Sequence, residues 1–207
     1  MRLKNDFAEY MYIGLFDHPQ DVTQEELERD LQQLPEWRRE KALTFKFMAG
    51  RVLCSKAYLL LKEGLREYGI TEDVRFEYGA HEKPSLAGHP DIHFNLSHCP
   101  NGVLCVIDNE PVGCDIERIP DTLKMDLVRY CCCEAEVAGI TSSEHPETEF
   151  VRLWTMKESY LKLTGEGLRN DLKDLLTDSR RVSPVSFNTV IRPDRQFVYT
   201  VCRYSGH

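Results

Sequence analysis

The chain has 207 residues, of which 42% are hydrophobic and 29% charged, and its 26 Lys and Arg against 34 Asp and Glu give a formal net charge of -8. This composition is too apolar for a disordered chain, and the length suffices for one domain or for two halves of roughly 100 residues. The acidic balance excludes general electrostatic binding of nucleic acid, which requires a basic face. No segment resembles a signal peptide or a membrane span, so we expect a soluble protein.

Eight cysteines are spread along the chain, and three of them are contiguous at 131–133. Because no two form a C-x-x-C pair and several lie in apolar segments, the pattern predicts reduced, buried thiols rather than disulfides or a zinc cluster. Reduced thiols are typical of a cytoplasmic protein.

Hydrophobic periodicity predicts the elements of the first half. A long helix over 48–68 keeps a 3.6-residue period, and Gly69 stands at its C-terminal end. Before it, Thr23 and Glu26 match a capping box that opens a helix, and Pro35 ends that helix and can open the next. Strands are predicted at 10–16, 74–78, 92–96 and 103–107.

The second half follows a turn at 108–111, the break nearest the midpoint. We therefore expect two parts, residues 1–110 and residues 111–207. The pattern predicts a strand at 112–116, helices at 123–131 and 147–163, and a closing hairpin of 182–191 with 197–202.

Two acidic residues lie on one face of the strand predicted at 112–116. Side chains alternate along a strand, so Asp115 and Glu117 share a face, with Cα atoms about 6.6 Å apart, and both can reach one divalent cation. A solvated strand face is the simpler interpretation of such a pair. The apolar neighbours indicate an interior strand, where two unpaired acids would be costly, and this favours a metal.

Glu158 and Lys162 are four residues apart on a predicted helix, with Trp154 one turn earlier on the same face. Taken alone, the pair is typical of an ordinary surface ion pair. His98 ends a predicted strand, where a histidine is often simply exposed. A histidine zinc site is disfavoured because His93 and His98 would face opposite ways on a regular strand.

The one local excess of positive charge comprises Arg38, Arg39, Lys41, Lys46 and Arg51, around the start of the long helix. Such a run is either a solvated face or a binding site for phosphates.

Four motifs follow one another in a characteristic order: Lys83-Pro84, then FNLSH at 94–98, VGCDIE at 112–117 and WTMKESYLKLTG at 154–165. In this order the chain resembles the 4'-phosphopantetheinyl transferase superfamily, in its larger, surfactin-synthetase-activating (Sfp-like) branch. The resemblance implies a pseudodimeric α+β fold of two similar halves, each with a small antiparallel sheet packed on a long helix. The active site would lie in the cleft between the halves.

The same resemblance implies transfer of the 4'-phosphopantetheine arm of coenzyme A to a serine of an apo acyl or peptidyl carrier protein, which leaves adenosine 3',5'-bisphosphate. Asp115, Glu117 and Glu158 would hold Mg2+. Glu158, or a water that it orients, would accept the serine proton, and Lys162 would neutralise phosphate charge. The implied contacts to coenzyme A, with His98 toward its 3'-phosphate, are Arg38, Lys41, Arg51, Lys83, Pro84, Ser97 and His98.

The sequence departs from the family pattern in three places. One is Trp37, which interrupts the basic run and leaves the register of Arg38 against Arg39 open. Glu82 stands before Lys83 where family members usually have Gly. A further acidic position of the family has two candidates, Glu134 and Glu136, of which we prefer Glu136 for its spacing to Ile140.

Two other functions remain open. One is a divalent-metal-dependent phosphoester hydrolase, which would use water in place of a protein serine. The other is a non-catalytic module that binds coenzyme A or the carrier. We expect a monomer, because two halves in one chain suffice to enclose a cleft, and no nucleic-acid or membrane partner.

Overall fold

The computed structural model describes residues 11–79, 83–167, 172–177 and 184–205. Within these ranges the chain forms six α-helices and eight strands, arranged as three antiparallel sheets. The fold is therefore α+β, as predicted.

The first half begins with a strand and three helices and ends with four strands. Its elements are β1 (Tyr12–Phe16), α1 (Gln24–Gln32), α2 (Glu36–Leu43), α3 (Met48–Glu67), β2 (Phe76–Tyr78), β3 (Pro84–Leu86), β4 (His93–Cys99) and β5 (Gly102–Asp108).

Local sequence explains where these helices begin and end. The Thr23 hydroxyl accepts a hydrogen bond from the Glu26 N–H, and the Glu26 carboxylate accepts one from the Thr23 N–H, which is the predicted capping box. Pro35 is the N-cap of α2. Gly69 follows α3 with a φ of 77°, a left-handed conformation that glycine adopts without strain.

The second half contains one strand, three helices and a closing hairpin. Its elements are β6 (Val112–Arg118), α4 (Met125–Cys131), α5 (Glu134–Ser142), α6 (Pro146–Thr164), β7 (Val185–Arg192) and β8 (Phe197–Tyr204). Gly165 ends α6 with a φ of 73°.

The main sheets of the two halves have the same strand connectivity. The first is ordered β1-β5-β4 and the second β6-β8-β7, so in each half the first strand pairs with the last one. Tyr12 pairs with Ile107 in the first sheet, and Val112 pairs with Arg203 in the second. A small separate sheet joins β2 and β3. This matching order is what two similar halves would have.

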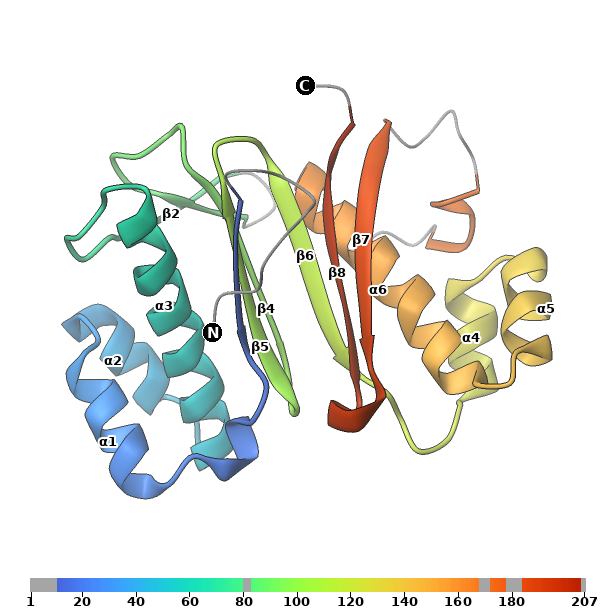
Figure 1. Ribbon diagram of the computed structural model, residues 1–207, viewed down its shortest axis with the longest axis horizontal. Coiled ribbons are helices and arrows are strands. Elements are labelled where there is room, and N and C mark those ends of the chain that lie inside the picture. The colour runs from blue at the N-terminus through green and yellow to red at the C-terminus, as the bar shows by residue number, and fades with distance from the viewer. Residues whose placement is uncertain (1–10, 80–82, 168–171, 178–183, 206–207) are drawn as a thin grey trace.

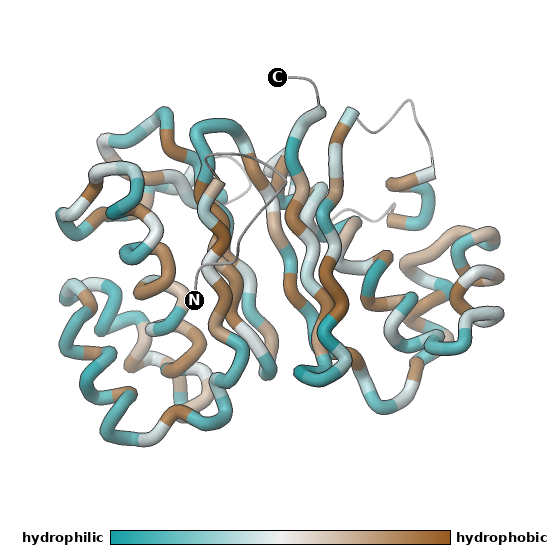
Figure 2. Tube along the Cα trace, viewed as in Figure 1, coloured by the Kyte–Doolittle hydropathy of each residue, from teal (hydrophilic) through white to brown (hydrophobic). Residues whose placement is uncertain are grey.

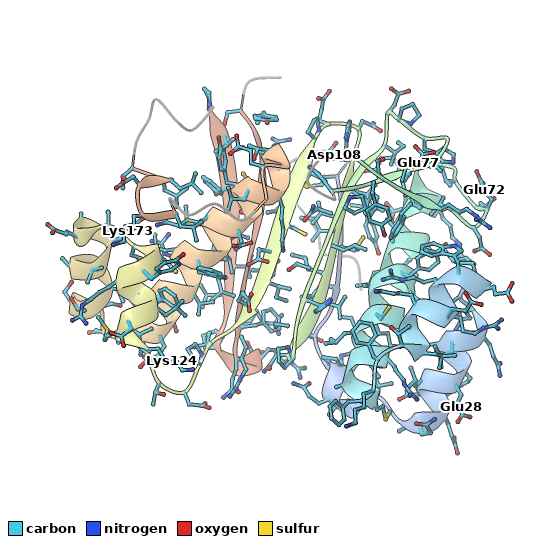
Figure 3. The ribbon with its side chains drawn as sticks, turned by 180° about the vertical axis from the view of Figure 1, so that it is seen from behind. Glu28, Glu72, Glu77, Asp108, Lys124 and Lys173 are labelled. Atoms are coloured by element: carbon cyan, nitrogen blue, oxygen red, sulfur yellow. The ribbon has the colours of Figure 1, made fainter. Side chains whose placement is uncertain are left out.

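The halves stack as four layers, with the two sheets inside and the helices outside (Figure 1). One buried cluster lies between α3 and the first sheet, and another lies between α6 and the second sheet. A third cluster fills the space between the sheets, with Ile13 and Leu104 on one side and Cys114 and Val201 on the other. Hydrophobic residues follow these inner strands (Figure 2), whereas charged side chains such as Glu28 and Lys124 lie on the outside (Figure 3).

Most of the predicted elements are present, with ends shifted by a few residues, but β3 and α5 were not predicted. The division at residue 110 stays a prediction, although the turn between β5 and β6 joins the two sheets there. Glu82 lies outside the described residues. No helix in the described part of the chain is both long and apolar enough to cross a bilayer.

Candidate active site

The two halves meet along β4 and β6, which are the edge strands of their sheets. The Asn95 side-chain oxygen accepts a hydrogen bond from the Cys114 N–H at 3.2 Å, and the Ser97 hydroxyl accepts one from the Ile116 N–H at 3.3 Å. Side chains of one half thus satisfy backbone donors that an edge strand would otherwise leave unpaired.

Alternation along β6 separates its apolar residues from its acidic ones. Cys114 and Ile116 are fully buried in the core between the sheets. Asp115 lies on the other face, opposite Thr200 of β8, whose hydroxyl is 2.8 Å from the Thr155 hydroxyl of α6. This face therefore lies under α6, and Asp115 is only 2% exposed, so the predicted interior strand is confirmed.

A glycine allows α6 to approach β6 closely. A Cβ at Gly113 would lie 2.1 Å from the Ser159 carbonyl oxygen and 2.5 Å from the Leu163 nitrogen, both of them backbone atoms of α6. Only a residue without a side chain fits at this contact. The contact places the turn of α6 that carries Glu158 and Lys162 over the acidic face of β6.

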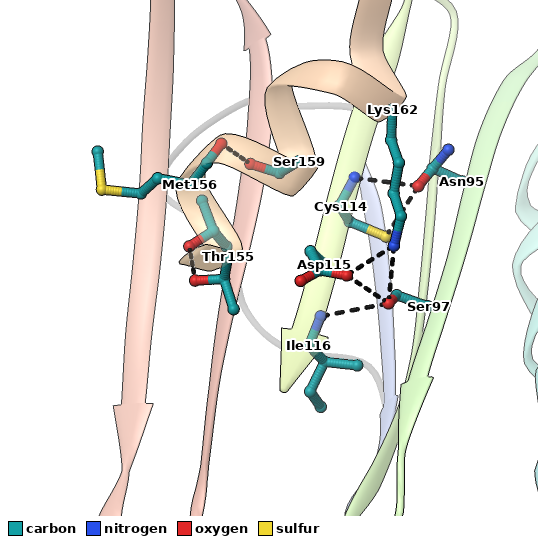
Figure 4. Close-up of polar contacts among 10 residues, drawn as sticks. Asn95, Ser97, Cys114, Asp115, Ile116, Thr155, Met156, Ser159 and Lys162 are labelled. Atoms are coloured by element: carbon teal, nitrogen blue, oxygen red, sulfur yellow. Dashed lines mark hydrogen bonds and ion pairs between the residues drawn. The ribbon is translucent and has the colours of Figure 1, made fainter. Parts of the chain in front are cut away.

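Lys162 joins three elements at the junction (Figure 4). Its Nζ lies 2.6 Å from Asp115 Oδ1 on β6 and 3.0 Å from the Ser97 hydroxyl on β4, and that hydroxyl donates to Asp115 Oδ1 at 2.8 Å. Burial would lower the pKa of Lys162, but the Asp115 carboxylate and its hydrogen bond raise it above the usual value. Ser97 of the first half is therefore in direct contact with Asp115 and Lys162 of the second half.

The neighbouring carboxyl groups hold their protons more tightly than usual. Burial and the Asp115 charge raise the pKa of Glu117 to about 7, although Lys162 and a hydrogen bond from Trp154 act in the opposite direction. Burial and Asp115 also raise the pKa of Glu158. The acidic groups of β6 and α6 therefore repel one another electrostatically.

This donor set fits a hard divalent cation. Asp115 Oδ2 and Glu158 Oε1 are buried and have no hydrogen-bond partner among the described residues, and carboxylate oxygens are the ligands that Mg2+ prefers. A cation would also offset the Asp115 charge, which adds to burial in raising the pKa of Glu117 and Glu158. As the side chains stand, no three metal-ligating groups among the described residues converge closely enough to hold an ion.

His98 connects this cluster to the basic residues of the first half. It follows Ser97 on β4 but faces the solvent. Desolvation lowers the pKa of His98, and the positive charges of Lys162 and Arg38 lower it further, so all three groups lie within electrostatic range. Arg38 of α2 is half-buried, donates to the Cys54 carbonyl oxygen at 3.2 Å and packs near the rings of Trp37, Tyr58 and Phe76.

Lys41 and Arg51 both lie on helices of the first half. Lys41 is exposed on α2. Arg51 of α3 donates to the Phe45 carbonyl oxygen at 2.9 Å.

Lys83 and Pro84 lie near the C-terminal end of α6. The Lys83 ammonium donates to the Leu163 carbonyl oxygen at 2.9 Å, and burial lowers the pKa of Lys83. Both residues line an open pocket of about 530 Å3, together with Gly165 of the second half and His93 of the first. The pocket is therefore formed by both halves.

Glu136 has a partner, Lys157, that was not predicted from the sequence. Lys157, which is 1% exposed, binds the Glu136 carboxylate at 2.7 Å and the Cys131 carbonyl oxygen at 2.8 Å. Glu136 also accepts from the N–H of Cys133, the N-cap of α5. This buried ion pair fixes α5 against α6 beside Glu158, whereas Glu134 is exposed. A capping-box pattern with cysteine at the cap is the signal that would have found the start of α5, with Glu136 in its first turn.

Comparison with known proteins agrees with this geometry. The family model of the 4'-phosphopantetheinyl transferase superfamily matches residues 111–203. The chain is 32% identical to the 4'-phosphopantetheinyl transferase Sfp of Bacillus subtilis (strain 168) over 163 residues, which cover 76% of this chain and 71% of that protein. It is also 32% identical to the 4'-phosphopantetheinyl transferase psf-1 of Bacillus pumilus, over 81% of this chain and 72% of the relative. With this similarity added to the shared motifs, the chain belongs to the 4'-phosphopantetheinyl transferase superfamily.

Proposed function

We propose that this protein transfers the 4'-phosphopantetheine group of coenzyme A to a serine hydroxyl of an apo acyl or peptidyl carrier protein. The serine oxygen forms a bond to the phosphorus that carries the pantetheine arm, the pyrophosphate bond breaks, and adenosine 3',5'-bisphosphate leaves. The observation that supports this most directly is the convergence of Asp115, Lys162 and Ser97 where the two halves meet.

Coenzyme A would bind across the junction between the halves. The pocket at Lys83 and Pro84 is lined by residues of both halves. This lining supports the binding of one end of coenzyme A in that pocket. His98 and Arg38 supply positive charge near Lys162 and suit the phosphates, with His98 toward the 3'-phosphate. Lys41 and Arg51, on α2 and α3, would extend this basic region.

The carboxylates Asp115, Glu117 and Glu158 would hold Mg2+, which would supply charge neutralisation at the pyrophosphate. Their fit to this ion rests on the two unpartnered buried oxygens and on the raised pKa values of Glu117 and Glu158.

Glu158 would accept the proton of the carrier serine, directly or through a water molecule. The Glu158 carboxylate is one helical turn from the Lys162 ammonium on α6, so the base and the charge that would neutralise the phosphate lie side by side. Lys162 would compensate negative charge on the phosphate during transfer. Asp115, its present partner, keeps this ammonium protonated.

The intact mass of an apo carrier protein, measured after incubation with coenzyme A, Mg2+ and this protein, tests the proposal. We expect a gain of one phosphopantetheine group, lost with Asp115→Ala and with a carrier that lacks its serine. Release of phosphopantetheine into water without carrier would favour the hydrolase. Binding of coenzyme A without any transfer, unchanged in Glu158→Ala, would favour the binding module.

We further propose that the monomer is the working unit and that it acts in the cytoplasm. The site is assembled from two halves of one chain, which supports the proposal that a monomer is sufficient for activity. All eight cysteines are free, and seven of them are buried, as expected in a reducing compartment.

A further inference from the structure

Ser97 is the residue of β4 whose side chain reaches both Asp115 of β6 and Lys162 of α6. It is 7% exposed, whereas the next residue, His98, faces the solvent, because side chains alternate along the strand. The sequence resemblance implies that both contact coenzyme A phosphates. Their environments differ so much that one role for both is physically implausible.

The Ser97 hydroxyl has no bonding capacity left for a phosphate. A hydroxyl has one proton to donate and two lone pairs to accept with. Ser97 donates to Asp115 Oδ1 at 2.8 Å and accepts from the Ile116 N–H at 3.3 Å and from Lys162 Nζ at 3.0 Å. A phosphate oxygen is an acceptor, so it would have to take the single proton away from Asp115.

Losing the hydrogen bond from the Ser97 hydroxyl would be unfavourable for the Asp115 carboxylate. Asp115 is 2% exposed, and within the described part of the chain its Oδ2 has no hydrogen-bond partner, so its contacts with Ser97 and Lys162 are both made by Oδ1. A phosphate at Ser97 would also bring a second anion against a buried carboxylate.

We propose that Ser97 is a positioning residue, whose hydroxyl spans the junction of the halves to fix Asp115 and Lys162, and that its side chain does not bind phosphate. By fixing Oδ1, the hydroxyl leaves Oδ2 available for a cation. The inference rests on the proposed function, because Asp115 and Lys162 matter through the transfer reaction. It assigns the hydroxyl a role between two reacting groups instead of a contact with the substrate.

The test compares Ser97→Ala with two matched variants. Ser97→Thr keeps the hydroxyl. Asn95→Ala removes a similar hydrogen bond between the halves, from the Cys114 N–H, but touches neither Asp115 nor Lys162. Each variant is measured for thermal stability, for kcat and KM of carrier modification, and for affinity for Mn2+, followed by the electron paramagnetic resonance signal of the free ion.

For Ser97→Ala we expect kcat and Mn2+ affinity to fall by about 10- to 100-fold, with KM for coenzyme A within about twofold of wild type. Ser97→Thr should recover most of both losses. Asn95→Ala should lose thermal stability comparably while keeping kcat within about threefold.

Three results would overturn the inference. A higher KM for coenzyme A with unchanged kcat and Mn2+ affinity in Ser97→Ala would identify a phosphate ligand. Equal losses of kcat in Asn95→Ala and Ser97→Ala would show only that the halves must hold together. A wild-type protein that neither modifies a carrier nor binds Mn2+ would refute the proposed function and this inference with it, whereas the first two results leave the function standing.

Discussion

Replacing Gly113 by Ala should displace the helix that carries the proposed catalytic groups. The added Cβ would lie 2.1 Å from the Ser159 carbonyl oxygen, and ordinary contacts of a Cβ begin at 3.4 Å. The backbone of α6 must therefore move away by about 1.3 Å, since a main-chain atom cannot rotate aside as a side chain can. Glu158 and Lys162 are on the same turns of α6 and would move with it.

Two quantities report this displacement. Overpacking of this kind costs about 1–3 kcal/mol of the free energy of unfolding, which thermal or denaturant unfolding measures. A shift near 1 Å in catalytic groups can lower the rate of a positioned reaction by about 100-fold. We therefore expect Gly113→Ala to lower the rate of carrier modification by about two orders of magnitude while the protein remains folded.

Gly139→Ala is the matched control. Gly139 is on α5 and exposed, and a Cβ there would meet nothing within 4 Å. The same substitution should therefore stabilise the protein slightly, by about 0.5–1 kcal/mol, because alanine favours a helix. If Gly113→Ala modified the carrier at the wild-type rate with unchanged stability, the close packing of α6 on β6 would be refuted as the device that positions Glu158 and Lys162.

Two further predictions concern carboxyl groups near the site. Glu136→Gln should lower the free energy of unfolding by about 3–5 kcal/mol, because it leaves the Lys157 ammonium buried without its counter-ion, whereas Glu134→Gln on the exposed face should change it by less than about 0.5 kcal/mol. Equal denaturation midpoints for these two variants would contradict the ion pair. Glu117 keeps its proton up to a pH of about 7 in the fold but releases it near its ordinary pKa of 4.5 when unfolded. The metal-free protein should therefore lose stability as pH rises between these values, by at most about 3 kcal/mol, and a melting temperature equally pH-dependent in Glu117→Gln would refute this assignment.

The sequence predicted the elements better than the contacts between them. The period of α3, the capping box at Thr23 and the shared face of Asp115 and Glu117 all follow from local spacing, which the backbone geometry enforces. α5 was missed because its residues show little amphipathic pattern and its cap is a cysteine, a residue not expected there.

The site was predictable only in part. The resemblance gathered Asp115, Glu158 and Lys162 at one centre, and the structure brings Lys162 into contact with Asp115. The junction of β4 with β6 depends on how two sheets pack across the molecule, and no local pattern carries that information. For this reason the contact of Ser97 with Asp115 and the need for Gly113 emerge only from the structure.

The pairing of first with last strand in each main sheet has a consequence for how the chain folds. Tyr12 pairs with Ile107, and Val112 pairs with Arg203, so both sheets depend on contacts between residues that are far apart in the sequence. A high contact order slows folding, because the entropy of closing a large loop is lost before the contacts that stabilise the sheet can form. During synthesis the first sheet can form once β5 has emerged, while the side chains of β4 that later bind β6 remain solvated. The reaction centre should therefore be the last part of the molecule to assemble.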